Sequence, residues 1–141
     1  AAGNRLRTLR EAHADSPYVA MATFAVATAA MDAGNPGRAA DALGWVTDQQ
    51  ADSPLAVVAR LRQAEALRVE GDRSAALAVL EPLPDGPLRG RFLELQGDLE
   101  VAQGNTDAAI EAYQQALQAI SGQRRSLVEI KLFDLGGAPA S

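Results

Sequence analysis

The sequence ELQGDLEVAQGNTDAAIEAYQQAL, residues 94–117, gives the clearest indication of the fold. Two runs of helix-forming residues meet at Gly104-Asn105, where glycine can take the left-handed conformation that ends one helix and asparagine can cap the next. Small residues stand on both sides, with Gly97 seven residues before this glycine and Ala109 five residues after it. Because small side chains let helices approach closely, the stretch predicts two helices packed against each other across a tight turn.

The same arrangement occurs twice more upstream. Glycine followed by a small polar residue recurs at Gly71-Asp72 and at Gly34-Asn35, and each copy has alanine seven residues before the glycine and five residues after it. The tetrapeptide ADSP also occurs twice, at residues 14–17 and 51–54. Its serine can cap a helix, and its proline suits the first helical position. Three such units indicate a helical repeat protein.

We therefore expect an all-α protein with a right-handed solenoid of about three helix-turn-helix units and a C-terminal capping helix. The units would span about residues 17–50, 54–83 and 88–120 of a single domain, residues 1–135. Residues 1–14 would form the end of an N-terminal helix, and residues 136–141 would form a flexible tail. The expected helices are residues 4–14, 17–33, 36–49, 54–70, 73–82, 88–103, 106–120 and 127–135.

The last of these helices is expected from a capping box. Ser126 and Glu129 have the spacing in which a serine and a glutamate satisfy the free N–H groups at a helix start. Leu127, Ile130 and Phe133 would then lie on one side of the helix. We expect this helix to cover the exposed flank of the last unit, as repeat proteins require.

The composition excludes several classes of function. Hydrophobic residues make up 48% of the chain but aromatic residues only 4%, which favours close-packed helices. A net charge of -5 gives no electrostatic attraction to nucleic acid, and the absence of cysteine excludes disulfides and thiol chemistry. No run approaches the roughly 20 apolar residues of a membrane span, so a soluble piece is expected, with any anchor upstream of Ala1.

Catalytic chemistry is not indicated. His13 is the single histidine, and no nucleophile or base can be assembled around it. Glu94 and Asp98 share a helix face, but such a pair is more typical of a solvated or peptide-facing stripe than of a metal or acid–base site. Residues 34–37 lack the lysine of a phosphate-binding loop. We expect no enzyme activity and no catalytic, cofactor or metal site.

The third unit resembles the tetratricopeptide repeat. The resemblance lies in Gly97, Gly104, Ala109, Tyr113 and Ala116, which follow the small, glycine, alanine and aromatic positions of that repeat. It implies a tetratricopeptide-like solenoid.

A narrower resemblance covers residues 15–135. Residues 94–117, residues 55–80 (LAVVARLRQAEALRVEGDRSAALAVL) and residues 130–135 are similar to the YfgM-type ancillary subunits of the bacterial Sec translocon. Those proteins have one membrane-spanning helix and a periplasmic tetratricopeptide-like domain. The resemblance implies the periplasmic side of the inner membrane, with SecYEG and a PpiD-type chaperone as partners and unfolded exported chains as candidate ligands.

The candidate binding surface follows from repeat geometry. The first helix of each pair lines the concave side of a solenoid, where a polypeptide can lie. Phe24 and Leu61 are either apolar contacts on this surface or core residues. A groove for a C-terminal carboxylate is not indicated, because Phe24, Leu61 and Glu94 stand where its basic pattern would begin. The candidate groove residues are Phe24, Thr28, Met31, Leu61, Glu65, Arg68, Arg91, Glu94 and Asp98.

We therefore predict a non-enzymatic scaffold for protein–protein interaction that links SecYEG to periplasmic chaperones during export. The alternative is a general adaptor that assembles another envelope or cytosolic complex through the same fold.

Overall fold

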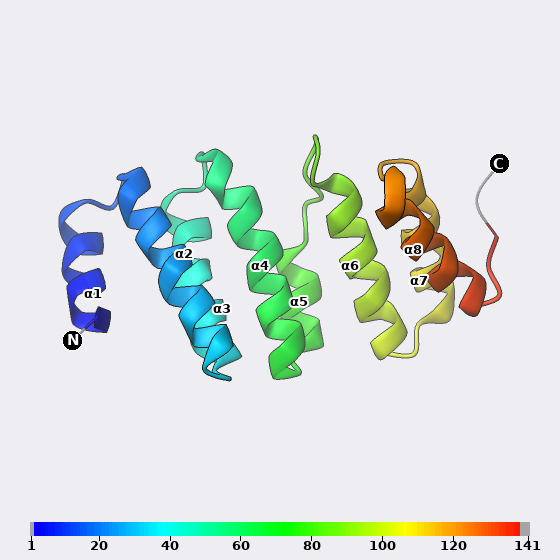
Figure 1. The fold of residues 1–141 in the computed structure, drawn as a ribbon, viewed down its shortest axis with the longest axis horizontal. Coiled ribbons are helices and arrows are strands. Elements are labelled where there is room, and N and C mark those ends of the chain that lie inside the picture. Colours follow the sequence, from blue (N-terminus) through cyan, green and yellow to red (C-terminus); the bar gives the residue numbers. More distant parts are fainter. Residues whose placement is uncertain (1, 139–141) are drawn as a thin grey trace. The chain divides into compact units, whose positions relative to one another are not determined.

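The computed structural model describes residues 2–138, which form eight α-helices and no strand (Figure 1). The all-α class is confirmed. The helices are α1 (Ala2–Ala12), α2 (Pro17–Asp32), α3 (Pro36–Gln49), α4 (Pro54–Glu70), α5 (Arg73–Val79), α6 (Arg89–Ala102), α7 (Thr106–Leu117) and α8 (Gly122–Asp134).

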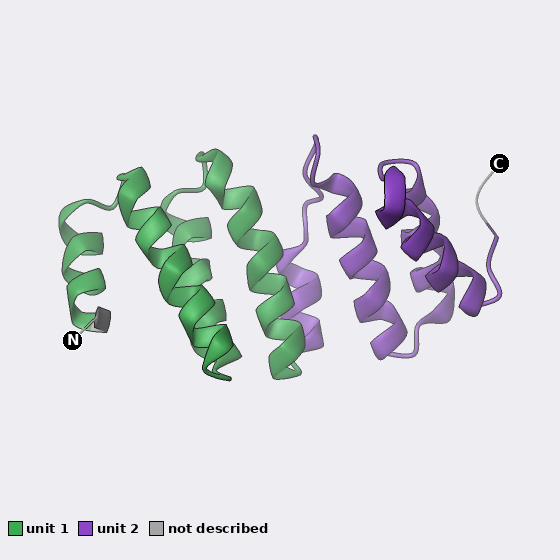
Figure 2. Cartoon of the chain, viewed as in Figure 1, with its two compact units in different colours: residues 1–72 green, residues 73–141 purple. Residues whose placement is uncertain are grey.

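The chain divides into two compact units (Figure 2). Residues 1–72 form unit 1, which contains α1 to α4, and residues 73–141 form unit 2, which contains α5 to α8. The second expected helix pair, residues 54–83, thus places its first helix in unit 1 and its second helix in unit 2. The single domain expected from the sequence stays a prediction.

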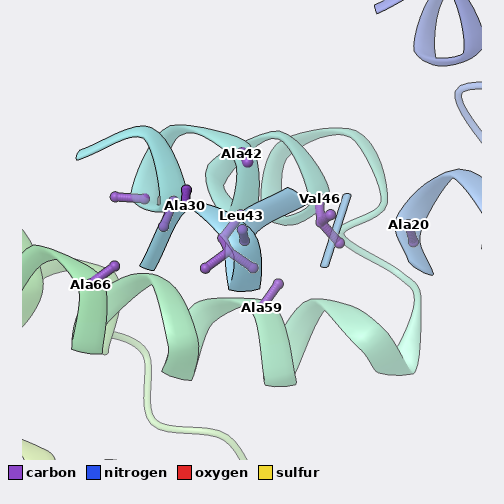
Figure 3. Close-up of a cluster of buried hydrophobic side chains, with 10 residues drawn as sticks. Ala20, Ala30, Ala42, Leu43, Val46, Ala59 and Ala66 are labelled. Atoms are coloured by element: carbon purple, nitrogen blue, oxygen red, sulfur yellow. The ribbon is translucent and has the colours of Figure 1, made fainter. Parts of the chain in front are cut away.

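Unit 1 has a core of small side chains. Ala39 of α3 and Ala59 of α4 are fully buried, and Leu43 and Val46 are the large side chains between them. Figure 3 shows Leu43 directed towards α4, beside Ala59. A larger side chain at either alanine would force the helices apart, because a close-packed core has no room for it.

α1 contacts the rest of unit 1 through Leu6 and Arg10. Leu6 is buried, and the guanidinium carbon of Arg10 lies 4.7 Å from the centre of the Trp45 ring. Arg10 Nη2 also donates to Thr23 Oγ1 at 3.5 Å. Trp45, which also packs against the core of unit 1, therefore links α1 to that core.

The close approach in unit 2 depends on Gly97. A Cβ atom at this position would lie within 2.6 Å of Tyr113 Cδ1, so the α7 aromatic ring occupies the space that any other residue would need. Tyr113 packs in a buried cluster with Leu93, Val128 and Leu132. The pairing of a small residue with an aromatic residue thus joins α6 to α7.

The glycine turns and the serine caps have the expected geometry, but the cap expected from Asn105 is wrong: its side chain makes no cap hydrogen bond at the start of α7, and its Nδ2 donates to Glu100 Oε2 at 2.8 Å. Gly34, Gly71 and Gly104 have φ angles of 75°, 98° and 81°, a region that side chains disfavour. Ser16 and Ser53 cap α2 and α4, each accepting a hydrogen bond from the backbone N–H two residues later at 3.2 Å.

The expected start of the last helix is wrong. α8 begins at Gly122, so Ser126 lies inside the helix and forms no capping box. The buried side of α8 also differs from the expected one, because Val128 and Leu132 face the core and Leu127, Ile130 and Phe133 are exposed. The additional first turn contains Arg124, which hydrogen-bonds to α6.

The segment after α8 makes two hydrogen bonds to the last two helices. Gly137 N donates to Leu132 O at 3.1 Å, and Gln114 Nε2 donates to Ala138 O at 2.7 Å. The flexible tail expected at residues 136–141 stays a prediction, and its residues 139–141 lie outside the described part of the chain.

The end of α4 provides a test of the junction geometry. Gly71 N and Asp72 N both donate to Leu67 O, at 3.1 and 2.9 Å, and this cap needs the positive φ of Gly71. Gly71→Val should lower the free energy of unfolding by at least about 1 kcal/mol, because a branched side chain is strained there. Urea denaturation measures the change.

Gly71→Asn is the control, since asparagine tolerates the left-handed region better than valine does. Equal stability of the valine variant and the wild type would contradict the proposed cap.

Candidate protein-interaction surfaces

The nine candidate groove residues lie on α2, α4 and α6. Those on α2 and α4 belong to unit 1, and those on α6 belong to unit 2. The two groups have different environments. Unit 1 has an open cavity at this surface, whereas in unit 2 the acidic side chains are bound by the chain's own C-terminal helix.

The unit 1 cavity lies over the α3 side chain Leu43. It has a volume of about 280 Å³. Leu43 and Ala27 are buried, whereas Thr28 is exposed and Met31 and Glu65 are half-buried. The lining residues are Ala27, Thr28, Met31, Asp32, Leu43, Arg62 and Glu65. Three of the sequence-predicted residues, Thr28, Met31 and Glu65, are thus brought together.

Phe24 lies beside a cation rather than at the bottom of a groove. The guanidinium carbon of Arg62 is 5.1 Å from the centre of the Phe24 ring, a geometry in which the ring face attracts the positive charge. Phe24 itself is half-buried. Its stacking with Arg62 connects α2 to α4 next to the cavity.

Leu61 and Arg68 differ from the other α4 candidates. Leu61 is 8% exposed, so it is a core residue and cannot contact a partner directly. Arg68 is exposed in the last turn of α4 and is not among the residues that line the cavity. Of the two interpretations left open by the sequence, burial is correct for Leu61.

In unit 2, Glu94 is a buried carboxylate with two cationic partners. The residue is 2% exposed, and its oxygens accept from Arg124 Nε at 2.7 Å and from Lys131 Nζ at 2.9 Å. Arg91 Nε lies 3.7 Å from the same carboxylate, one turn away on α6. The charge of Glu94 is therefore compensated inside the chain, as a buried charge requires.

Asp98 extends this network by one helical turn. Lys131 Nζ donates to both of its oxygens, at 3.0 and 3.2 Å, and the hydroxyl of Tyr113 donates to Oδ1 at 2.6 Å. Lys131 thus bridges the two carboxylates that the sequence places on one helix face. Arg91, Glu94 and Asp98 are brought together, but they serve to bind α8 to α6.

The network changes the acidity of Glu94. Burial by itself raises the pKa of the carboxyl, because it disfavours the charged form. The hydrogen bonds from Lys131 and Arg124 and their positive charges outweigh burial, so the pKa of Glu94 lies below its ordinary value. The carboxylate stays ionised at neutral pH.

Sequence reasoning missed the partners in both units. Arg62 and Asp32 line the unit 1 cavity but were not among the candidates. Arg124 and Lys131 are seven residues, or about two turns, apart on one face of α8, and both hydrogen-bond to Glu94. Lys131 is the single lysine of the chain, a signal that could have drawn attention to it.

No metal or membrane-spanning element is found in the described part of the chain. Among residues 2–138, His, Asp and Glu form no group of three or more that could hold a metal ion. His13 is exposed just after α1. None of the helices described between residues 2 and 138 combines the length and the hydropathy that a bilayer crossing needs.

Comparison with known proteins agrees with the helical hairpins. Residues 1–137 match the model of the tetratricopeptide repeat-like domain family. The chain belongs to this family. The match includes both units and therefore extends the resemblance seen in the third repeat to nearly the whole chain.

A curated relative supports the narrower resemblance. The chain is 30% identical over 132 residues to a protein of Neisseria gonorrhoeae named ancillary SecYEG translocon subunit. The alignment covers 92% of this chain and 63% of the relative, so the chain spans less than two thirds of that protein's length. The similarity to this class of translocon subunits, expected from the sequence, is confirmed.

The pKa of Glu94 leads to a testable pH dependence. Because the folded-state pKa is lowered, the stabilisation is fully present above the ordinary glutamate pKa of about 4.3 and is lost as the pH falls through the folded-state value. Glu94→Gln should lower the free energy of unfolding at pH 7 by about 1–3 kcal/mol. The free energy of unfolding of this variant should also fall less steeply as the pH drops below the ordinary glutamate pKa. Urea denaturation from pH 7 to 3 measures both effects.

Glu111→Gln is the matched control, because it removes one exposed carboxylate from the neighbouring helix α7. If Glu94→Gln and Glu111→Gln had the same stability at pH 7, the buried network would contribute nothing to the attachment of α8.

Proposed function

We propose that the chain is a non-enzymatic scaffold that binds protein partners through the unit 1 cavity. The observation that carries the proposal is the composition of this cavity. Its buried residues Ala27 and Leu43 are apolar, and charged side chains from α2 and α4 stand around them. Binding sites for polypeptides combine these two features, since an apolar anchor gives affinity and polar groups at the edge fix orientation.

The size of the cavity is compatible with one side chain of a partner. A volume of about 280 Å³ lies just below the range of typical ligand pockets. Arg62 stands on its α4 side and Asp32 on its α2 side, so both a donor and an acceptor line the cavity. A polypeptide segment with one aliphatic anchor would use all of these groups.

The translocon supplies the most specific candidate partners. The relative from Neisseria gonorrhoeae is named as an ancillary SecYEG translocon subunit, and this chain aligns with it over 132 residues. We propose that the chain works at the periplasmic side of a bacterial inner membrane and links SecYEG to a PpiD-type chaperone. Attachment to the membrane would come from a segment upstream of Ala1.

The cavity can be blocked without disturbing the core. Thr28 lines the cavity and is exposed, so Thr28→Arg would fill the space with little effect on packing. We expect Thr28→Arg in the full-length, membrane-attached protein to reduce co-purification of its partners from native membranes by at least about fivefold, equivalent to about 1 kcal/mol. Quantitative mass spectrometry of the purified complex measures this.

Ala29→Arg is the control, since Ala29 is the next residue of α2, is exposed and does not line the cavity. Unchanged recovery of partners with Thr28→Arg would remove the cavity from the proposal. If the wild-type protein instead forms a stable complex that contains no Sec component, the role of a general adaptor is favoured.

A further inference from the structure

Asp32 is an uncompensated charge at one end of the unit 1 cavity. It is the last residue of α2, is exposed and lines the cavity. In the part of the chain that the structure describes, its side chain forms no ion pair and no hydrogen bond. The last turn of α2 contains no basic residue. This position is unfavourable for the folded chain, because the C-terminal end of a helix carries a partial negative charge and prefers cations.

Glu70 occupies the corresponding end of α4, but its charge is compensated. A Cβ atom at Gly37 would lie 2.7 Å from Glu70 Oε1 and 2.8 Å from Oε2. Gly37 is the second residue of α3, so the Glu70 carboxylate lies against the first turn of that helix. The free N–H groups and the partial positive charge of a helix start attract an anion. The described chain thus provides a counter-charge for Glu70 and none for Asp32.

Arg62 lines the same cavity but is stacked at a different place on α2. Its guanidinium carbon lies 5.1 Å from the centre of the Phe24 ring. Phe24 precedes Asp32 by eight residues, which corresponds to about 12 Å along the helix. This separation exceeds the Debye length of about 8 Å at physiological ionic strength. The positive charge beside Phe24 is therefore largely screened from Asp32, and the Asp32 end of the cavity stays anionic.

We propose that the cavity selects polypeptide segments in which an aliphatic residue is followed directly by lysine or arginine. This inference rests on the proposed function and names the chemistry of the segment that the cavity binds. The aliphatic side chain would lie over the buried Leu43 and Ala27, and the cation would pair with Asp32. Charge complementarity favours this occupant, since the lining carries the carboxylates of Asp32 and Glu65 and the single guanidinium of Arg62.

A side-chain cation suits this position better than a metal ion does. Within residues 2–138, His, Asp and Glu form no group of three or more that could hold a metal ion. Met31, which precedes Asp32, is half-buried in the cavity lining and offers an apolar, flexible surface. The methylene groups of a lysine or arginine can lie on such a surface while the charged end reaches a carboxylate.

The charge should adjust affinity rather than provide most of it. Because Asp32 is exposed, its pairing with a cation should strengthen binding by only about twofold to fivefold. The aliphatic anchor supplies the remaining affinity through burial of apolar surface. Added salt should therefore reduce the preference for a cation and leave the binding of the anchor nearly unchanged.

The first test compares four short synthetic peptides with blocked ends, made of glycine and serine around a central pair. The pair is leucine–lysine, leucine–glutamine, leucine–glutamate or alanine–lysine. NMR titration of the 141-residue chain, followed at the backbone amides of Thr28 and Met31, gives each Kd. Leucine–lysine should bind about twofold to fivefold more tightly than leucine–glutamine, and leucine–glutamate should bind more weakly than both. Alanine–lysine should bind at least about fivefold more weakly than leucine–lysine.

Two variants of Asp32 test the assignment of the cation. Asp32→Asn should make the leucine–lysine and leucine–glutamine peptides bind equally, and Asp32→Lys should make leucine–glutamate the tighter ligand. Glu70→Gln is the matched control, because it removes one carboxylate from the last residue of α4, outside the cavity lining. It should leave the order of the peptides unchanged.

Urea denaturation of the same variants separates a ligand-binding role from a structural one. Asp32→Asn should leave the unfolding midpoint unchanged or raise it, because it removes a negative charge from a helix C-terminal end. Glu70→Gln should lower the midpoint, since its carboxylate stabilises the start of α3.

Three outcomes would overturn the inference. Equal affinities of the wild type for leucine–lysine and leucine–glutamate would remove the selection for a cation and leave the cavity as a polypeptide site. If no peptide shifts the amides of Thr28 and Met31 at about 20 mM, the cavity does not bind such segments, and the proposed function fails with the inference. A midpoint that falls equally in Asp32→Asn and Glu70→Gln would show that Asp32 serves the fold.

Discussion

Small side chains at the helix contacts let neighbouring helices approach closely, and the other contacts of each unit form only at this spacing. Gly97 leaves room for the Tyr113 ring, and Ala39 and Ala59 do the same for Leu43 in unit 1. The Tyr113 hydroxyl, held at this short distance from α6, can then donate to Asp98. Packing and polar contacts therefore rely on the same spacing, so a larger residue at Gly97 would disturb both.

The two units use equivalent first-helix positions for different purposes. On α2 and α4 of unit 1, these positions surround an open cavity, whereas on α6 of unit 2 they bind the cations of α8. The buried charge of Glu94 requires such a partner within the chain, because an uncompensated carboxylate would cost several kcal/mol. In unit 1, the residues that line the cavity include no buried carboxylate. No cation from another helix of the chain is therefore needed there to compensate a buried charge.

Local features were predictable from the sequence, and features that depend on distant contacts were not. The caps at Ser16, Ser53 and Gly71 were expected because their geometry involves neighbouring residues. The burial of Leu61 and the start of α8 were not, since each depends on packing with other helices. Arg124 and Glu94 are thirty residues apart, and neither residue type indicates its partner. Three of the six candidate groove residues of unit 1 line the cavity, and the burial of Leu61 was left open by the sequence, because a repeat register gives the side of a helix but not the depth of each side chain.

We expect the unit 1 cavity to contact another polypeptide in the cell. Site-specific photo-crosslinking from position 28 tests this contact, because the reactive group replaces an exposed side chain that lines the cavity. The account predicts crosslinks to a translocon component or a periplasmic chaperone from position 28 and none from position 29. Equal crosslinking from both positions, or none from position 28, would contradict it.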